Sequence, residues 1–188
     1  MTAEDRFRIL CVCTGNVCRS PAAALLLSAG LGPEVEVASA GTRALVGHPL
    51  SPPMDALVAG AGGDPTGFAA RQLTERLARP ADLVLALTRE HRGEVVELWP
   101  AAVRRTFTLR EFARLVQVVD PDLLPPPTSP AARLRALVPA AAAHRRQVAD
   151  PGSDDVVDPY RRPAEVYQEA FSHIEQAVRA VVAVVRAG

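Results

Sequence analysis

The chain of 188 residues contains no lysine, and arginine supplies all of its strongly basic side chains. Schiff-base chemistry at a lysine and a phosphate loop built around a lysine are therefore both excluded. The formal net charge is zero, so the composition lacks the basic field typical of nucleic-acid-binding proteins and an acidic tail that would attract a basic partner. We expect no nucleic-acid partner.

Long apolar runs are also missing. The charged start MTAEDRFR is not typical of a signal peptide, and arginine interrupts the longest apolar stretch, which lies near the C-terminus. These absences predict a cytoplasmic protein without a membrane partner. Hydrophobic residues still make up 48% of the chain, which is enough to bury the core of one compact domain over residues 1–188.

Cysteine is scarce and clustered, because Cys11, Cys13 and Cys18 fall within eight residues. A disulfide framework would distribute its cysteines along the chain, so this cluster favours a reactive or redox site. The four histidines lack the spacing of metal ligands, and we predict no metal site. One of them, His91, follows a predicted strand and could approach the edge of a site there.

Apolar runs alternate with amphipathic segments along most of the chain. The predicted strands are residues 7–13, 35–41, 81–87 and 104–109, and the predicted helices are residues 21–30, 54–62, 69–78, 89–100, 110–119 and 164–188. This alternation predicts parallel βαβ units in a three-layer α/β fold. Ligands bind at the carboxyl ends of the strands in such sheets, which places the residues after 7–13 at the site.

Residues 120–157 differ in composition, being rich in proline and alanine. We predict an insertion that runs over the surface of the single domain, with one helix broken at Pro139.

Residues 13–20, CTGNVCRS, combine a strand end, a turn and a helix start, with Ser20 expected to cap the helix. Backbone N–H groups in such a turn, together with the positive end of the helix dipole, form a site for an anion. Gly15 and Asn16 tolerate the left-handed backbone that the turn needs. Arg19 suits two oxygens of a phosphate group and favours the thiolate form of the nearby Cys13, which would then attack the bound anion.

The segment CTGNVCRSP resembles the phosphate-binding loop of the bacterial low-molecular-weight protein tyrosine phosphatases. Further motifs follow in the order of that family, namely SAGT at 39–42, ARQL at 70–73, ADLVLAL at 81–87 and VDPY at 157–160. The resemblance implies a four-stranded parallel sheet of order 2-1-3-4 with helices on both faces. It also implies that the substrate is a phosphotyrosine protein and that a cognate tyrosine kinase is a further partner. The oligomeric state stays open.

The resemblance implies a two-step reaction that needs no cofactor. Cys13 would attack phosphorus and form a phosphocysteine while Arg19 and the loop amides hold the phosphoryl oxygens. The residues implied to bind phosphate or substrate are Thr14, Gly15, Asn16, Val17, Cys18, Ser20 and Tyr160. Ser20 would donate a hydrogen bond to the sulfur. Cys18 either fills the loop or forms a reversible disulfide with oxidised Cys13, and Cys11 is expected to be buried and inert.

An aspartic acid would protonate the leaving oxygen and then activate water. Asp-Pro occurs four times, at Asp64, Asp120, Asp150 and Asp158. Only Asp158 precedes a tyrosine and the last predicted helix, as in the family, and it is therefore the predicted acid. Tyr160 would form a wall of the pocket and stack on an aromatic substrate.

The chain departs from the family pattern at three places. Residues 120–157 are longer than is usual in the family and could cover or extend the rim of the site. Residues 43–50 carry no aromatic side chain, where many relatives have one on the wall of the cleft, and this predicts a cleft that is either more open or less selective for phosphotyrosine. Arg161 and Arg162 follow Tyr160 where many relatives have a second tyrosine, and this favours substrates with acidic residues beside the phosphotyrosine.

Four other functions are alternatives to phosphotyrosine hydrolysis. Thioredoxin-coupled arsenate reductases share the fold but need a distal cysteine pair, and no cysteine follows Cys18 here. A thiol–arsenate transferase would not need that pair and stays open. Protein-arginine phosphatases of this family carry threonine at the position of Val17, so the apolar residue favours an aryl phosphate. A phosphate-binding module without activity is disfavoured by the presence of Cys13, Arg19, Ser20 and Asp158.

Overall fold

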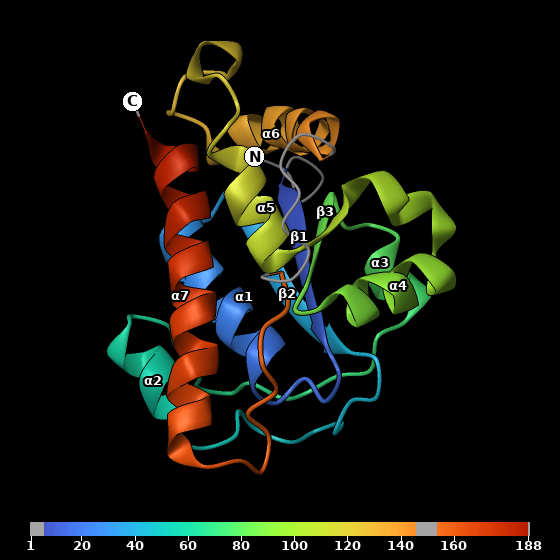
Figure 1. Cartoon of the computed structure of the whole chain (residues 1–188), viewed down its shortest axis with the longest axis vertical. Helices are drawn as coiled ribbons and strands as arrows, with labels where there is room; N and C mark the ends of the chain where they lie inside the picture. Colours follow the sequence, from blue (N-terminus) through green and yellow to red (C-terminus); the bar gives the residue numbers. More distant parts are fainter. Residues whose placement is uncertain (1–5, 146–153, 188) are drawn as a thin grey trace.

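The computed structural model describes residues 6–145 and 154–187, which form a layered α/β structure (Figure 1). Its sheet contains β1 (Phe7–Cys13), β2 (Val35–Gly41), β3 (Leu83–Ala86) and β4 (Thr106–Thr108), all parallel and in the order β2-β1-β3-β4. The predicted fold class and strand order are confirmed. The register pairs Cys13 with Gly41, so the carboxyl ends of β1 and β2 lie together.

Seven α-helices are found within the described residues. They are α1 (Arg19–Leu31), α2 (Met54–Gly60), α3 (Glu75–Ala78), α4 (Arg89–Leu98), α5 (Leu109–Val116), α6 (Pro130–His144) and α7 (Ala164–Arg186). Two 3₁₀ turns follow helices, η1 (Pro100–Arg105) after α4 and η2 (Pro121–Leu123) after α5. The long C-terminal helix is confirmed. Its buried face consists of Tyr167, Ala170, Ile174, Ala177, Val178, Val181 and Val185.

Successive side chains of β1 point to opposite faces of the sheet and belong to two different apolar clusters. Ile9 and Cys13 face the larger apolar cluster, which α1, α5, α6 and α7 cover. Leu10 and Val12 face the smaller cluster, where Val95 of α4 packs. This period-2 alternation places the Cys13 side chain on the same side of the sheet as α1.

The predicted helix over residues 69–78 is wrong. Only α3, its last turn, is helical, and Gln72 instead forms an isolated parallel bridge with Gly41. Gly41 donates its N–H to the Arg71 carbonyl at 2.9 Å and accepts the Leu73 N–H at 2.7 Å. These backbone hydrogen bonds hold residues 71–73 beside the last residue of β2, so tertiary pairing overrides the local helix pattern.

The predicted break at Pro139 is also wrong, because α6 is continuous through this residue. Pro139 and Arg135 both lie on the exposed side of α6, so the carbonyl that loses its helical partner faces water. The other side buries Leu134 and Leu137 against the core, and residues 120–145 are therefore not purely a surface excursion. That the chain is one domain with an insertion at 120–157 stays a prediction.

None of the helices in residues 6–145 and 154–187 is both long enough and apolar enough to cross a bilayer.

Candidate active site

The loop between β1 and α1 points its peptide groups in one direction. The carbonyls of Cys13, Thr14 and Gly15 accept hydrogen bonds from the N–H groups of Thr42, Arg43 and Leu45, at 2.9, 2.9 and 3.0 Å. The Val17 carbonyl accepts the Ser51 N–H at 2.7 Å. A trans peptide directs its N–H opposite to its C=O, so the amides of residues 14, 15, 16 and 18 face away from the 42–51 segment and toward the concave side of the loop.

Asn16 holds this loop from beneath. It adopts a left-handed backbone with φ of 54°, is fully buried, and uses every polar atom of its side chain. Its Nδ2 donates to Ser20 Oγ and to Ser39 Oγ, both at 2.9 Å, and its Oδ1 accepts the Arg71 N–H at 2.9 Å. Arg71 in turn donates from Nε to the Ser39 carbonyl at 2.7 Å. The SAGT and ARQL motifs therefore support the loop.

Ser20 does not cap α1 as predicted. The helix begins at Arg19, with Cys18 at the cap position and no side-chain cap. The Ser20 hydroxyl is fully buried and lies 3.0 Å from Cys13 Sγ and 3.3 Å from the Ala40 carbonyl. Since Asn16 donates to Ser20 Oγ, the single hydroxyl proton has two acceptors within reach, the Ala40 carbonyl and the Cys13 sulfur, and a Cys13 thiolate would be the stronger of the two.

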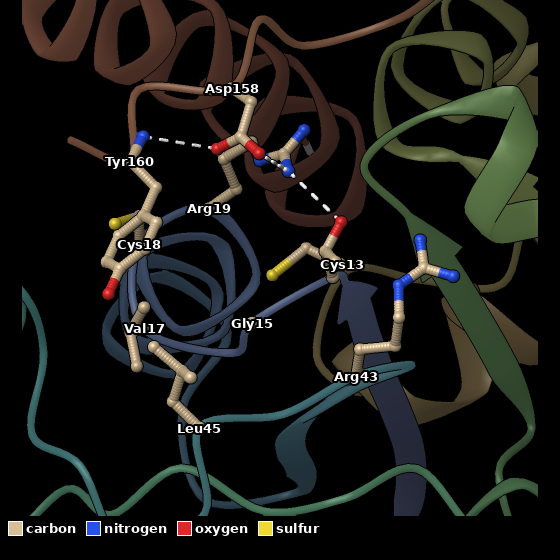
Figure 2. A pocket seen from close by; sticks show the side chains of 10 residues that line it. Cys13, Gly15, Val17, Cys18, Arg19, Arg43, Leu45, Asp158 and Tyr160 are labelled. Atoms are coloured by element: carbon tan, nitrogen blue, oxygen red, sulfur yellow. Dashed lines mark hydrogen bonds and ion pairs between the residues drawn. The ribbon is translucent and has the colours of Figure 1, made fainter. Parts of the chain in front are cut away.

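Arg19 and Asp158 meet above the cysteine (Figure 2). Arg19 Nη2 lies 2.8 Å from Asp158 Oδ2, and Nη1 donates to the Val156 carbonyl at 3.2 Å. The Arg19 side chain is only 5% exposed, whereas that of Asp158 is 53% exposed. Asp158 Oδ1 also accepts the Tyr160 N–H at 3.2 Å, which closes a turn at the rim.

The other Asp-Pro sites lie elsewhere. Asp64 is exposed and accepts the Thr66 N–H in a local turn, and Asp120 accepts the Asp122 N–H at the start of η2. Asp150 lies outside the described residues.

A cavity of about 140 Å³ opens above Cys13. Eight of the ten predicted site residues line it, and these are Cys13, Thr14, Gly15, Val17, Cys18, Arg19, Asp158 and Tyr160. The remaining two, Asn16 and Ser20, lie beneath the loop. Sequence reasoning did not single out Arg43 and Leu45, which complete the lining.

The walls of this pocket differ in character. Val17, Leu45 and Tyr160 form an apolar side, whereas Arg43 lies on the opposite side of Cys13 (Figure 2). Arg43 pairs with Glu94 at 3.1 Å and with Glu90 at 3.8 Å. The apolar side is suited to the face of a ring, and the base of the pocket is suited to an oxyanion.

The three cysteines experience different surroundings. Burial raises the pKa of Cys18 to about 11, although its thiol lies 4.0 Å from the Tyr167 hydroxyl. Burial raises the pKa of Cys11 still further. Both residues are therefore thiols at neutral pH, as expected for Cys11, and all three cysteines are free.

His91 has a larger part in the site than its sequence position indicated. It is buried, and its Nε2 lies 2.8 Å from Thr14 Oγ1 while its Nδ1 lies 2.8 Å from Thr88 Oγ1. Burial and the neighbouring positive charge of Arg19 lower the pKa of His91 to about 4. The neutral ring donates through one nitrogen and accepts through the other, so it links the third strand's end to the loop. Arg19 Nη2 also reaches Thr14 Oγ1, at 3.5 Å.

Within residues 6–145 and 154–187, no group of three or more histidine, cysteine or acidic side chains is arranged to hold a metal ion.

Fold and loop together define an α/β protein with an oxyanion-binding loop at the carboxyl end of its first strand. The family model described as low molecular weight phosphotyrosine protein phosphatase matches residues 8–138. The chain is 39% identical to the low molecular weight protein-tyrosine-phosphatase Etp of Escherichia coli (strain K12) over 113 residues, which is 60% of this chain and 76% of that protein. It is 40% identical to a protein-arginine-phosphatase of Geobacillus stearothermophilus over 173 residues, or 92% and 91% of the two chains.

A solved structure agrees with these matches. The YwlE arginine phosphatase from Geobacillus stearothermophilus has a TM-score of 0.68 and 31% identity, covering 94% of this chain and 90% of that one. The chain belongs to the low molecular weight phosphotyrosine protein phosphatase family, a family of phosphoric monoester hydrolases. The predicted family and enzyme class are confirmed.

Proposed function

We propose that the protein hydrolyses phosphotyrosine in protein substrates through a phosphocysteine on Cys13. The observation that carries this proposal is the convergence of three groups on one pocket. Cys13 lies at its base beside the amides of the loop, Arg19 lies above the sulfur, and Asp158 lies at the rim within 2.8 Å of Arg19. These are a nucleophile, an oxyanion site and a proton donor in reach of one bound group.

In the first step, the Cys13 thiolate attacks phosphorus, an S–P bond forms and the P–O bond to the tyrosine oxygen breaks. Loop amides and the Arg19 guanidinium donate hydrogen bonds to the three equatorial oxygens. They stabilise the negative charge on these oxygens in the transition state without having to reorient. Asp158 gives its proton to the departing phenolate oxygen. The substrate anion replaces Asp158 as a partner of Arg19 Nη2.

In the second step, Asp158 takes a proton from a water molecule, which attacks phosphorus from the side that the phenol has left. The S–P bond breaks and inorganic phosphate forms. Ser20, 3.0 Å from the sulfur, donates its hydroxyl proton in a hydrogen bond to the thiolate that leaves.

The apolar wall formed by Val17, Leu45 and Tyr160 supports an aryl phosphate as substrate. A phosphotyrosine ring can pack against this wall, whereas the guanidine of phosphoarginine would leave polar N–H groups beside apolar side chains. Hydrolysis of phosphoarginine is the second candidate function, because a protein-arginine-phosphatase is 40% identical over 92% of this chain.

We also propose that the substrates are proteins phosphorylated by a tyrosine kinase and that the enzyme acts in the cytoplasm. Etp, which matches the chain, is named as a protein-tyrosine-phosphatase.

The test is turnover of p-nitrophenyl phosphate in the presence of EDTA, followed by turnover of phosphotyrosine and phosphoarginine peptides of one sequence. We expect activity that vanadate inhibits, that disappears in Cys13→Ser and that falls strongly in Asp158→Ala. Asp64→Ala, in an exposed Asp-Pro turn, is the matched control and should retain full activity. Absence of turnover in the wild type would overturn the proposal, and faster hydrolysis of the phosphoarginine peptide would favour the second candidate.

A further inference from the structure

Asp158 lies in a segment that has no regular structure of its own. Residues 154–158, here called the acid segment, form neither helix nor strand. The Asp158 side chain is 53% exposed, and among the described residues it pairs with Arg19 and accepts the Tyr160 N–H. The position of this carboxylate therefore depends on how the rest of the acid segment is held.

Asp155 makes the most extensive contact of the acid segment. Its Oδ1 accepts the backbone N–H of Arg89 at 2.7 Å, and its Oδ2 accepts from Arg89 Nη2 at 3.0 Å. Arg89 Nε lies 3.3 Å from both oxygens, which completes a two-pronged ion pair. Arg110 Nη1 donates to the Asp155 carbonyl at 3.3 Å. Two parallel hydrogen bonds from a planar guanidinium fix orientation as well as distance.

Other contacts hold Asp154 and Val156, the residues on either side of Asp155. Arg114 Nη2 of α5 lies 2.8 Å from Asp154 Oδ1. The Val156 N–H donates to the Leu87 carbonyl at 2.9 Å, directly after β3. These bonds bring the acid segment to the carboxyl end of the sheet. Of the contacts described here, the one with Arg89 is the most extensive, because the Asp155 carboxylate accepts both from the backbone N–H of Arg89 and from its charged guanidinium.

Arg89 is the first residue of α4, and its backbone N–H has no partner within the helix. The Asp155 carboxylate supplies that partner and lies at the positive end of the helix dipole. Two residues later in the same turn, His91 contacts Thr14 of the phosphate loop at 2.8 Å. One turn of α4 therefore contacts both the loop that carries the nucleophile and the segment that carries the acid.

We propose that Arg89, acting through Asp155, is a positioning residue for the general acid Asp158. The proposal rests on the function proposed above. Proton transfer requires the carboxyl group to lie within hydrogen-bond distance of the leaving oxygen. If the Arg89–Asp155 pair is lost, the acid segment can move away from α4, and Asp158 occupies that position for a smaller fraction of the time.

The consequence depends on the leaving group. A phenol of low pKa leaves as its anion with little help, whereas a phenol of high pKa needs the proton during P–O cleavage. Loss of positioning therefore lowers kcat/KM more for phenyl phosphate than for p-nitrophenyl phosphate. A positioned general acid contributes roughly a hundredfold to ten-thousandfold, so we expect about a tenfold loss on phenyl phosphate and a smaller one on p-nitrophenyl phosphate.

The experiment measures kcat/KM for a series of substituted phenyl phosphates and plots its logarithm against the pKa of the phenol. The variants are Arg89→Gln and Asp155→Asn, each of which removes the ion pair, together with their double variant and Asp158→Asn. Arg179→Gln is the matched control, since Arg179 forms a 2.7 Å pair with Glu175 on α7 outside the pocket. Arg89→Lys keeps the charge without the fork and should restore part of the activity. Thermal unfolding of each variant reports on folding.

We expect a steeper negative slope in Arg89→Gln and Asp155→Asn, approaching the slope of Asp158→Asn, with no further change in the double variant. Equal losses across the series, or an unchanged slope, would overturn the positioning role. An unchanged slope in Asp158→Asn itself would instead overturn Asp158 as the acid, and with it that part of the proposed function. The two failures are therefore distinguishable. If Arg89→Gln fails to fold, Asp155→Asn, which still offers Oδ1 to the Arg89 N–H, decides the question.

Discussion

Arg19 Nη2 lies 2.8 Å from Asp158 Oδ2, so the oxyanion-binding side chain and the proposed acid are in contact across the pocket mouth. The second guanidinium nitrogen, Nη1, is held by the Val156 carbonyl at 3.2 Å. Arg19 thus keeps one nitrogen on the acid segment when the other turns to a phosphoryl oxygen. This arrangement couples the orientation of the arginine to the position of the acid.

Ser20→Ala should slow turnover with little effect on KM. Removing the hydroxyl 3.0 Å from Cys13 Sγ leaves the departing thiolate without a hydrogen bond, and a bond to a charged group contributes about 1.5–3 kcal/mol. We expect kcat to fall on the order of tenfold to a hundredfold. Ser28→Ala, at an exposed position of the same helix, is the control in steady-state assays. An unchanged kcat in Ser20→Ala would exclude the hydrogen bond as a contributor.

Gly41→Ala should displace the phosphate-binding loop, which packs against Gly41. A Cβ at this position would lie 2.4 Å from the Thr14 carbonyl oxygen and 3.0 Å from Asn16 Cβ, so the loop backbone must shift. We expect a loss of roughly 1–3 kcal/mol in the free energy of unfolding and a lower kcat/KM. In Gly93→Ala, where a Cβ meets nothing within 4 Å on α4, stability should stay the same or rise. Denaturant unfolding distinguishes the two, and equal stabilities would contradict the close approach.

His91 should make the fold sensitive to acid. Its pKa is lowered to about 4 by burial and by Arg19, whereas an unfolded histidine titrates near 6.5. Between these values the unfolded chain takes up a proton that the folded one does not, so stability falls as the pH drops from 7 toward 4. The expected loss from this residue is about 2 kcal/mol between pH 7 and pH 5.

His91→Gln removes the titration while retaining a polar side chain. The free energy of unfolding of this variant, measured in urea at pH 7 and pH 5, should change by about 2 kcal/mol less than that of the wild type. The same pH dependence in both proteins would show that His91 is not a buried neutral imidazole.

Iodoacetate should label Cys13 selectively. Burial raises the pKa of Cys18 to about 11 and that of Cys11 further, so both remain as less reactive thiols at neutral pH. The reagent is an anion, and the loop amides and Arg19 draw it to the base of the pocket. Peptide mapping by mass spectrometry should find carboxymethyl groups on Cys13, with protection by inorganic phosphate. Labelling of Cys18 at a comparable rate, or an absence of protection, would contradict this assignment.

Much of the fold was predictable because its signals are local. The apolar run of residues 7–13 predicts a buried strand, and the TGNVCRSP turn places an anion site after it. The strand order followed only from the resemblance to the family, since alternation of strands and helices does not by itself order a sheet.

Features that depend on distant partners could not be predicted. Ser-Pro is typical of a helix start, yet the Ser20 hydroxyl is buried against Cys13 and does not cap. Arg71 and Gln72 lie in a helix-like pattern but pair beside the end of β2, because Gly41 offers an unpaired edge there. The place of His91 after a predicted strand indicated only that it could approach the edge of the site, and its contact with Thr14 arises only when β1 and β3 pair.

The central claim is that Cys13 carries the phosphoryl group during turnover. Its most direct test is to mix Asp158→Ala, in which hydrolysis of the intermediate is slowed, with p-nitrophenyl phosphate, to quench in detergent, and to locate the phosphoryl group by peptide mass spectrometry. We predict one phosphoryl group on the peptide that contains Cys13, attached to this residue, and none on the corresponding peptide of Cys13→Ala, in which the nucleophilic atom is absent. A phosphoryl group on another residue, or none while p-nitrophenol is released in a burst, would contradict the account.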